Sequence, residues 1–234
     1  MHECAGVGAK EPLRLVLVGL QGVGKSATGN TILSSEEFHS DISSSALTLQ
    51  TESKEGLVCR RSVMVVDTPG LFNSSLSDTE MKQEMEKAVT LCHPGPHVFL
   101  IIIQLGRFTE QERRVMDKLT EVLGSNVKQY CMVLFTYGDK LKNKTIDQFV
   151  KEDMNLVKLI SKCGGLYHVF NNADTENKAQ VRELLEKIDT MINRRKKQPF
   201  YVKGETHEQY PWAQILCIIL PVVVAVGLWR DWWF

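Results

Sequence analysis

The sequence predicts a three-layer α/β sandwich, in which helices cover both faces of a mostly parallel central sheet. Five short runs are apolar and rich in β-branched residues, without polar alternation, as is typical of parallel strands buried on both faces. These runs are residues 13–18, 62–66, 97–105, 130–136 and 167–170. Amphipathic segments follow them at residues 25–33, 78–91, 109–123, 147–161 and 176–192. Strand–helix alternation of this kind favours a parallel sheet, because parallel neighbours need a crossover connection.

The length, charge and cysteines of the chain limit what it can be. Its 234 residues suffice for one large domain and an appendage, and 28 basic residues balance 28 acidic ones. This balance does not point to a nucleic-acid partner. The six cysteines form no Cys-x-x-Cys pair and no zinc spacing, which indicates a reduced, cytosolic domain. Residues 1–12 lack the apolar stretch of a secretory signal, and His2 excludes N-myristoylation.

A glycine-rich segment follows the first predicted strand. Residues 19–26 read Gly-Leu-Gln-Gly-Val-Gly-Lys-Ser, which matches the phosphate-binding P-loop pattern G-x-x-x-x-G-K-[ST]. Glycines let such a loop curl until backbone N–H groups face the phosphates, and the next helix adds partial positive charge. Lys25 is expected to reach the β- and γ-phosphates, and Ser26 to offer its hydroxyl to Mg²⁺. The alternative is an ordinary Gly-rich turn. The predicted nucleotide contacts here are Gly19, Gln21, Gly22, Val23, Gly24, Lys25, Ser26 and Ala27.

The second predicted strand ends in a carboxylate. Asp67 closes an apolar run, and Thr68-Pro69-Gly70 follows it directly. Asp67 is expected to hold Mg²⁺ through water, as the acid of a Walker-B motif does. Gly70 has no side chain, so its N–H can approach a γ-phosphate closely. The alternative for this segment is a plain β-turn, in which Pro and Gly are favoured.

Three motifs together resemble those of the GTPases of immunity-associated proteins, the GIMAP family, which is related to septins and chloroplast import GTPases. They are residues 19–33, the Asp-Thr-Pro-Gly-Leu-Phe segment at 67–72, and Leu-Gly-Arg-Phe-Thr at 105–109. The resemblance covers about residues 12–192. It implies a P-loop GTPase-type three-layer sandwich that binds GTP or GDP with Mg²⁺.

The resemblance also implies where the base is recognised. Residues 135–139, Phe-Thr-Tyr-Gly-Asp, match the guanine motif T-R-x-D of the family, with Tyr137 where the family usually has Arg. Thr136 and Asp139 then contact the nucleotide, and Asp139 accepts hydrogen bonds from guanine N1–H and the 2-amino group. The alternative for Asp139 is an ordinary loop carboxylate after a strand.

Two asparagines and a threonine complete the implied nucleotide site. The segment Phe170-Asn171-Asn172 resembles the last nucleotide motif of the family, so Asn171 or Asn172 is expected at the base. Asparagines are also common in turns for backbone reasons alone. Thr48 aligns with the switch threonine of the family and is expected to close over Mg²⁺ and the γ-phosphate. The surrounding Ser- and Thr-rich residues 34–56 are predicted to be a mobile loop region.

Hydrolysis of GTP is expected to be slow. Leu71 and Phe72 follow Gly70, so no glutamine stands where a water-positioning residue could act in cis. The resemblance implies dimerisation across the nucleotide face, with Arg107 acting in trans on the phosphates. The alternatives for Arg107 are a solvated arginine at a helix start and a structural ion pair.

The C-terminal region predicts a membrane anchor. Residues 213–229 contain no charged side chain over 17 residues. A helix of that length spans about 26 Å, close to the roughly 30 Å hydrocarbon core of a bilayer. Tryptophans flank the stretch, and a basic run at 194–197 precedes it, which favours a cytosolic amino-terminal side. The alternative is a buried core or dimerisation helix. Few residues follow, so we expect a single-pass tail anchor, and its shortness favours the endoplasmic reticulum.

The expected organisation therefore has five parts. They are an N-terminal tail at 1–11, a GTPase domain at 12–193, a basic linker at 194–211, a transmembrane tail anchor at 212–230 and a short tail at 231–234. The expected function is a GTP-hydrolysing switch on the cytosolic face of an intracellular membrane, which forms a GTP-dependent homodimer or oligomer. The alternative is a nucleotide-dependent membrane scaffold with little hydrolysis. An ATPase is opposed by Asp139 and by the Asp-Thr-Pro-Gly motif.

Overall fold

A six-stranded sheet forms the centre of the protein. The computed structural model describes residues 11–40 and 48–204, and all statements below concern those ranges. The strand order is β2-β3-β1-β4-β5-β6, and every pairing is parallel except the antiparallel pair of β2 with β3. The strands are β1 (Leu13–Gly19), β2 (Glu52–Val58), β3 (Arg61–Asp67), β4 (Val98–Gln104), β5 (Cys131–Thr136) and β6 (Tyr167–Val169). The predicted mostly parallel α/β sheet is confirmed.

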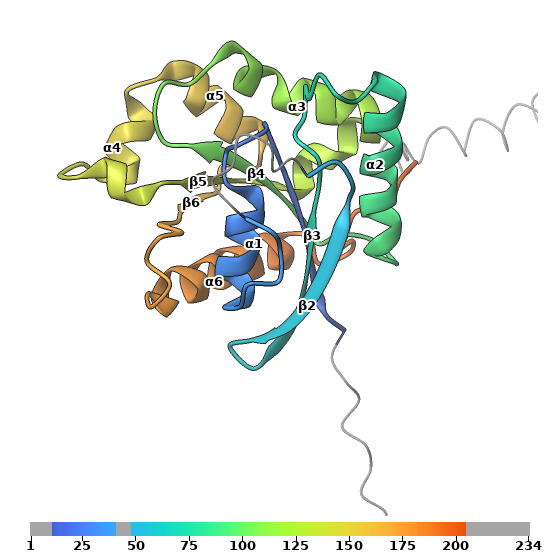
Figure 1. Ribbon diagram of the computed structural model, residues 1–234, viewed down its shortest axis with the longest axis horizontal. Coiled ribbons are helices and arrows are strands. Elements are labelled where there is room, and N and C mark those ends of the chain that lie inside the picture. The colour runs from blue at the N-terminus through green and yellow to red at the C-terminus, as the bar shows by residue number, and fades with distance from the viewer. Residues whose placement is uncertain (1–10, 41–47, 205–234) are drawn as a thin grey trace, which may run out of the picture. The chain divides into compact units, whose positions relative to one another are not determined.

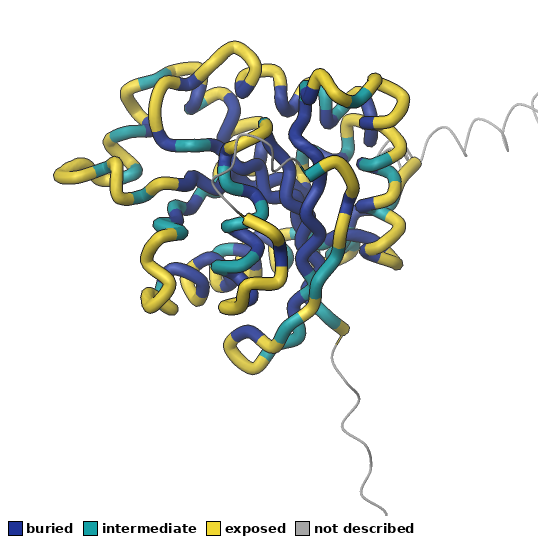
Figure 2. Tube along the Cα trace, viewed as in Figure 1, coloured by how far each residue is buried: buried dark blue, intermediate teal, exposed yellow. Residues whose placement is uncertain are grey.

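Helices cover both faces of this sheet (Figure 1). One face packs against α1 (Lys25–Leu33) and α6 (Lys178–Arg194). The other packs against α2 (Asp78–Leu91), α3 (Glu110–Leu123) and α5 (Met154–Lys162). The short elements are α4 (Ile146–Lys151) and the 3₁₀ turns η1 (Ser125–Tyr130) and η2 (Gly138–Leu141). The strands β1, β4 and β5 at the centre are almost wholly buried, as Figure 2 shows for the middle of the sheet, which explains their largely apolar sequences.

Helix boundaries follow capping residues in the sequence. Both α2 and α3 begin with a capping box, in which an N-cap hydroxyl and a glutamate three residues later each bond to the backbone of the other. The predicted helix at 147–161 is divided in two, because α4 ends at Lys151 and Asp153 caps the start of α5 by accepting from the Asn155 amide at 2.8 Å. The periodicity alone did not reveal this internal cap.

The edge strand β2 departs from the sequence prediction. Residues 34–56 were expected to be a mobile loop, but β2 begins at Glu52 and pairs with β3 along its whole length. Its turn uses Cys59 and Arg60, both at positive φ, as in the mirror-image turns that suit hairpins. The strand has mostly polar, partly exposed side chains, because only one of its edges is paired. Residues 41–47 of the predicted loop lie outside the described ranges.

A C-terminal strap, residues 199–203, packs against the amino-terminal ends of the strands. Tyr201 is 0% exposed, and its hydroxyl donates to the Leu123 carbonyl. Its ring makes edge contacts with Phe99 and Tyr130. Arg195 stacks over the Tyr130 ring, with the guanidinium carbon 4.2 Å from the centroid. The compact unit therefore reaches Lys203, beyond the boundary at residue 193 that the sequence suggested.

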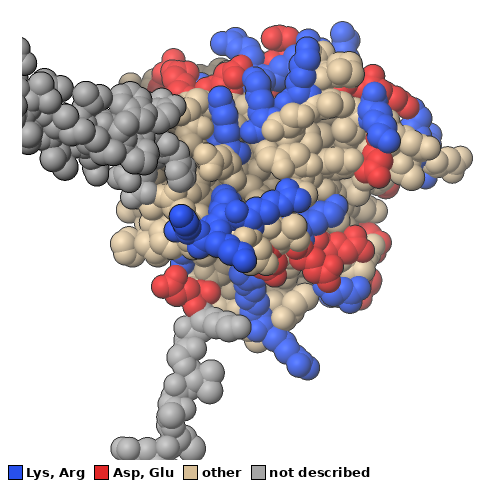
Figure 3. Space-filling model, turned by 180° about the vertical axis from the view of Figure 1, so that it is seen from behind, with Lys and Arg blue, Asp and Glu red and all other residues tan. Residues whose placement is uncertain are grey.

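Surface charges of both signs are mixed. Figure 3 shows Lys and Arg running across the middle of one face, with Asp and Glu beside them. Ion pairs that join different parts of the fold include Lys118 with Asp78 at 2.7 Å, Arg61 with Asp189 at 2.6 Å, Lys203 with Glu86 at 2.6 Å, and Lys162 with Asp117 at 3.3 Å. Exposed pairs of this kind contribute little stability each, typically about 0–1 kcal/mol. These ion pairs connect neighbouring elements but add little to the free energy of unfolding.

The predicted membrane anchor at 212–230 lies outside the described residues. Within residues 11–40 and 48–204, no helix is long and apolar enough to cross a bilayer. The anchor therefore stays a prediction.

Candidate nucleotide-binding site

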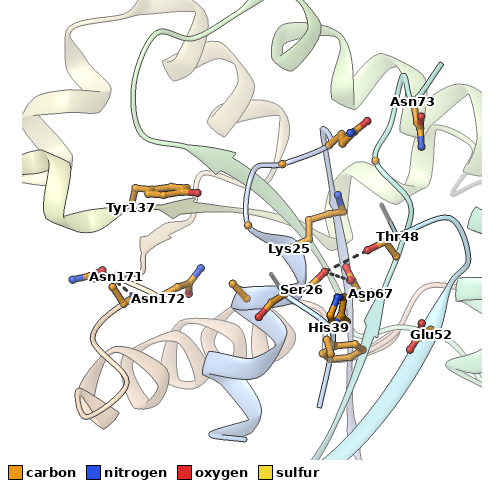
Figure 4. A pocket seen from close by; sticks show the side chains of 18 of the residues that line it. Lys25, Ser26, His39, Thr48, Glu52, Asp67, Asn73, Tyr137, Asn171 and Asn172 are labelled. Carbon is orange, nitrogen blue, oxygen red and sulfur yellow. Dashed lines mark hydrogen bonds between the residues drawn. The ribbon is translucent and has the colours of Figure 1, made fainter. Parts of the chain in front are cut away.

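A cavity of about 1040 Å³ opens at the carboxyl ends of β1, β3 and β5. In parallel α/β sheets this edge is where ligands bind, because loops and helix N-termini converge there. Figure 4 shows Ser26, Thr48 and Asp67 grouped at one end and Tyr137, Asn171 and Asn172 at the other. The predicted site residues that line the cavity are Gln21, Gly22, Gly24, Lys25, Ser26, Ala27, Thr48, Asp67, Gly70, Asp139, Asn171 and Asn172. Gly19, Val23, Thr136 and Arg107 are not among its lining residues.

The backbone of the glycine-rich loop requires glycine at specific places. Gly24 has φ 90° and immediately precedes α1, whose first residues line the cavity. The first N–H groups of a helix have no partner within the helix. Gly70 lies against the same loop, where an added Cβ would come within 2.6 Å of the Gln21 nitrogen. A side chain at Gly70 would therefore displace the loop. The approach of the Gly70 N–H to a γ-phosphate stays a prediction.

Two opposite charges are buried at the phosphate end. The Lys25 ammonium donates to the Leu20 carbonyl at 2.9 Å. Burial lowers the pKa of Lys25, and the nearby Asp67 carboxylate acts in the opposite direction. Burial likewise raises the pKa of Asp67, against the influence of Lys25 and of the hydrogen bond from Ser26. Both charged forms thus lose hydration that their mutual attraction only partly replaces.

The donor set suits a divalent cation. Ser26 Oγ donates to Asp67 Oδ2 at 2.6 Å, and Thr48 Oγ1 lies 3.4 Å from Ser26 Oγ. Asp67 Oδ1 is buried and has no hydrogen-bond partner among the described residues. Hard cations such as Mg²⁺ prefer hydroxyl, carboxylate and water oxygens. The three predicted metal residues therefore come together and leave one carboxylate oxygen without a protein partner.

Thr48 is held near this group through its neighbour Thr51. The Thr51 amide donates to the Glu84 carboxylate of α2, and the Thr51 hydroxyl donates to the Glu84 carbonyl at 3.1 Å. Thr51 is 3% exposed. The chain after Thr48 is thus attached to the helix that follows the Asp-Thr-Pro-Gly segment. Nothing in the local sequence indicated this contact.

The two asparagines at the base end have different surroundings. The Asn172 side chain donates to Thr28 Oγ1 at 3.2 Å and accepts from Thr31 Oγ1 at 2.9 Å, so both its ends are held by α1. Asn171 accepts the Ala173 amide at 3.1 Å, in a turn of the kind that asparagine favours. Both line the cavity, and Asn172 also connects its loop to α1.

Asp139 and Thr136, both from the predicted guanine motif, also have different surroundings. Asp139 lines the cavity and is exposed, and its side-chain carboxylate has no hydrogen bond or ion pair within residues 11–40 and 48–204. Its carboxylate is therefore available to a ligand. Thr136 is 0% exposed, and its hydroxyl donates to the Val23 carbonyl at 2.7 Å. It supports the phosphate loop from beneath rather than lining the cavity.

Gln180 on α6 is a positioning residue that sequence reasoning missed. It is 8% exposed, and its amide bonds to both the N–H and the carbonyl of Asn171, at 3.0 and 3.2 Å. A third bond reaches the Asp174 carbonyl at 3.1 Å. The base-side loop is therefore fixed from α6 by Gln180 and from α1 through Asn172. In the sequence, Gln180 is one polar residue of an amphipathic helix, and nothing there indicates this role.

Other cavity residues were also missed: Phe38, His39, Ser40, Glu52, Asn73, Tyr137 and Ala173. Glu52 reaches the site because β2 pairs with β3 and places it opposite Asp67 in register. Its negative charge contributes to raising the pKa of Asp67. Tyr137 could have been found from its place within the predicted guanine motif.

Arg107 lies outside the cavity of its own chain. It is exposed, and within the described ranges it has no hydrogen bond or ion pair. Two residues later Thr109 caps α3, so the Arg107 side chain stands just before a helix start.

Comparisons with known proteins identify the family of the chain. The model of the AIG1 family matches residues 13–213. The mouse protein "GTPase IMAP family member 8" is 33% identical over 183 residues, which are 75% of this chain and 27% of that protein. "Immune-associated nucleotide-binding protein 5" of Arabidopsis thaliana is 33% identical over 202 residues, 82% of this chain and 65% of that protein. The chain thus spans between about a quarter and two thirds of these two relatives.

Solved structures share the fold. Toc33 from Arabidopsis thaliana, as a dimerisation-deficient variant, aligns with a TM-score of 0.64 at 17% identity, over 80% of this chain and 86% of that one. Toc33 in complex with GDP and Mg²⁺ aligns with a TM-score of 0.61 at 18% identity, over 77% and 84% of the two chains. At this identity the likeness concerns the fold, which is that of a P-loop GTPase. Because the family model covers most of the chain, including the glycine-rich loop and the guanine motif, the protein belongs to the AIG1 family.

Proposed function

We propose that the protein binds GTP and GDP together with Mg²⁺ and acts as a switch that hydrolyses GTP slowly. One observation carries the proposal: a single cavity holds a phosphate loop at one end and the unpaired carboxylate of Asp139 at the other. A carboxylate at that position pairs with the N1–H and 2-amino donors of guanine. Adenine lacks this donor edge, so Asp139 favours guanine nucleotides.

The phosphate end supplies the electrostatics of the reaction. Lys25 and the N–H groups at the start of α1 would neutralise charge on the phosphates. Ser26, Thr48 and Asp67 would hold Mg²⁺, which when bound stabilises negative charge on the β- and γ-phosphates. Gly70, held against the loop, would offer its N–H to the γ-phosphate.

A role as a scaffold with little hydrolysis is the second candidate. Leu71 is 2% exposed and belongs to the core, and its amide donates to the Gly19 carbonyl at 2.9 Å. Phe72 packs partly against the same core. Neither side chain can orient an attacking water in its own cavity. Hydrolysis then needs a group from elsewhere, and without it the nucleotide would only control assembly.

We propose that a second copy supplies this group through Arg107, in a GTP-dependent homodimer or oligomer. The exposed, unpaired Arg107 outside its own cavity supports the proposal. Dimerisation is described as important for the GTPase activity of the related-fold proteins atToc33 and psToc159. An arginine offered in trans neutralises charge on the transferring phosphoryl group.

We further propose that residues 212–230 anchor the protein to a membrane, with the domain on the cytosolic face and the endoplasmic reticulum favoured. The uncharged stretch at 213–229 supports this. Deleting residues 205–234 should then move the protein from the membrane pellet to the soluble fraction after carbonate extraction. The deletion leaves the C-terminal strap in place, so the domain stays folded. Membrane retention of the deleted form would contradict the anchor.

The binding proposal is tested by competition. Calorimetry with GDP, GTP and ATP in the presence of Mg²⁺ should give tight binding of the guanine nucleotides and little binding of ATP. Lys25→Ala should abolish binding while leaving the domain folded. Thermal unfolding checks this, since the variant removes the positive charge beside the buried Asp67 carboxylate. Equal affinity for ATP and GTP would refute the guanine assignment.

A further inference from the structure

We propose that the ring of Tyr137 is the surface on which the nucleotide base stacks. The proposal rests on the proposed function, since it needs a nucleotide in the cavity. In this proposal Tyr137 binds the base by stacking, and Asp139 distinguishes guanine from other bases.

Tyr137 borders the end of the cavity at which a base is expected. It follows β5 directly and lines the same cavity as Asp139, two residues further along the chain. Figure 4 shows its side chain across from Asn171 and Asn172, at the end of the cavity away from Asp67. The ring and the 171–173 loop thus bound the two sides of one slot.

The ring has no structural use that accounts for its position. It is 39% exposed, among the few large apolar or aromatic side chains that the described surface exposes to this degree. Its hydroxyl has no hydrogen bond within the described ranges, unlike Tyr201, whose hydroxyl is bonded and whose ring is buried. An aromatic side chain that helps the core is expected to be buried and its hydroxyl paired.

The backbone at Tyr137 is held in an unusual conformation. Its φ of 59° lies in the left-handed region, which is costly for a bulky side chain. The next residue keeps it there, because the Gly138 amide donates to the Phe170 carbonyl at 2.9 Å. An added Cβ on Gly138 would also lie 3.2 Å from that carbonyl oxygen, so the two loops are tightly matched. Strain maintained in this way is typical of functional sites.

A cation supports the ring from one side. The Lys140 ammonium lies 4.3 Å from the ring centroid. Tyr137 lines the cavity, and Lys140 is not among the lining residues. This contact fixes the plane of the ring and leaves its other face for a base. Stacking on such a face tolerates any base, because every base has a π-face.

The test compares two substitutions in the full chain, kept in mild detergent because of its apolar C-terminal stretch. Tyr137→Asn removes the ring but suits the left-handed backbone, and Tyr137→Phe keeps the ring. Tyr137→Asn should weaken binding of GDP and of inosine diphosphate by a similar factor of roughly 5 to 150, the usual range for base–aromatic stacking. Tyr137→Phe should stay within about twofold of the unsubstituted chain.

Inorganic tripolyphosphate is the probe without a base. Its affinity should be the same in all three proteins, because stacking does not involve the phosphates. Leu57→Asn, at a residue 77% exposed and outside the cavity, is the matched control and should leave GDP binding unchanged. Thermal unfolding checks that each variant is folded.

The outcomes separate the stacking proposal from the function on which it rests. Failure of the unsubstituted chain to bind GDP would overturn the proposed function. Intact GDP binding that Tyr137→Asn does not weaken would overturn only the stacking. An equal loss in Tyr137→Phe, or a parallel loss of tripolyphosphate binding, would overturn it as well, since the ring face would then not be the group responsible.

Discussion

Asp67 places its two carboxylate oxygens in different surroundings. One accepts from Ser26 at 2.6 Å, and the other is buried without a partner in the described part of the chain. Folded proteins rarely leave a buried polar atom unsatisfied, because it has lost its hydration without replacement. At the carboxyl end of β3, beside Lys25, this oxygen is best explained as one reserved for a ligand. The free energy lost there would be recovered when Mg²⁺ and phosphate bind.

The proposed role of Asp139 predicts how a substitution there changes the preference between nucleotide bases. Asp139→Asn should weaken GTP binding and favour xanthosine triphosphate, because an amide can donate to the 2-carbonyl of xanthine and a carboxylate repels it. Hydrogen bonds to charged groups contribute about 1.5–3 kcal/mol, so the ratio of affinities should change by roughly 10- to 100-fold. Competition calorimetry measures this ratio. Asp174→Asn, on the neighbouring loop and outside the cavity lining, should not change it. Continued preference for GTP would exclude Asp139 as the base reader.

At the scale of elements, the C-terminal strap completes the domain. Tyr201 fills the space between Phe99 and Tyr130, and the backbone of the strap approaches Gly95 so closely that an added Cβ would clash with the Tyr201 carbonyl. The Tyr201 amide donates to the Pro96 carbonyl at 2.8 Å. The strap thus joins the chain after α6 to the segment before β4. A fragment ending before it would expose aromatic core.

Truncation should reveal this dependence. A fragment of residues 1–198 should unfold at a lower temperature than one of residues 1–204. Loss of a buried aromatic side chain costs about 3–5 kcal/mol. For a domain of this size that corresponds to roughly 6–20 °C. Tyr201→Ala in the longer fragment should reproduce most of the loss.

Lys203→Ala is the control, because its exposed ion pair with Glu86 should contribute only about 0–1 kcal/mol. Differential scanning calorimetry measures all four proteins. Equal unfolding temperatures for the two fragments would show that the strap does not stabilise the domain.

The same region predicts a dependence of stability on pH. Burial, then the positive charge of Arg14, lowers the pKa of His97 from its ordinary 6.5 to about 4. The His97 ring accepts the Arg14 amide through Nδ1 at 3.1 Å, which requires that nitrogen to be unprotonated. Between about pH 4 and 6.5 the folded state therefore binds fewer protons than the unfolded state, and the free energy of unfolding falls as pH falls.

His97→Gln should make this slope shallower over that interval. Burial also lowers the pKa of His168, so part of the slope remains in the variant. Denaturant unfolding at several pH values measures the difference between the two proteins. An identical slope would mean that His97 titrates alike in the folded and unfolded states.

At the scale of the whole molecule, Arg107 links turnover to assembly. If a second copy supplies Arg107, specific GTPase activity should rise with protein concentration, because each site then needs a partner. Arg107→Ala should remove this rise and leave nucleotide affinity nearly unchanged. An arginine supplied in trans typically changes the rate by about 10³–10⁵-fold. Phosphate release from residues 1–204 over a range of concentrations measures it.

Arg113→Ala is the matched control, since Arg113 is also near the start of α3 but pairs with Glu110 at 3.2 Å. It should keep the concentration dependence. A rate that is independent of concentration and of Arg107 would exclude the mechanism in trans. No turnover at any concentration would favour the scaffold function, which sizing with bound GTP would then have to support.

The sequence by itself determined the features that depend on neighbouring residues. The glycine-rich loop, Asp67 at the end of β3 and the guanine motif at 135–139 are local patterns whose chemistry requires those residue types in that order. The buried strands were also predictable, since burial on both faces leaves unbroken apolar runs. These patterns were sufficient to identify the family and the layers of the fold.

Only the tertiary structure decided the contacts between distant segments. β2 became a strand because β3 offers it a partner, although its own side chains are mostly polar and partly exposed. The strap belongs to the domain because Tyr201 finds an aromatic pocket far away in the sequence. In the same way, Asn172 is engaged by α1 and the loop beside it by Gln180. Such roles depend on long-range packing and hydrogen bonding, for which local residue patterns carry no signal.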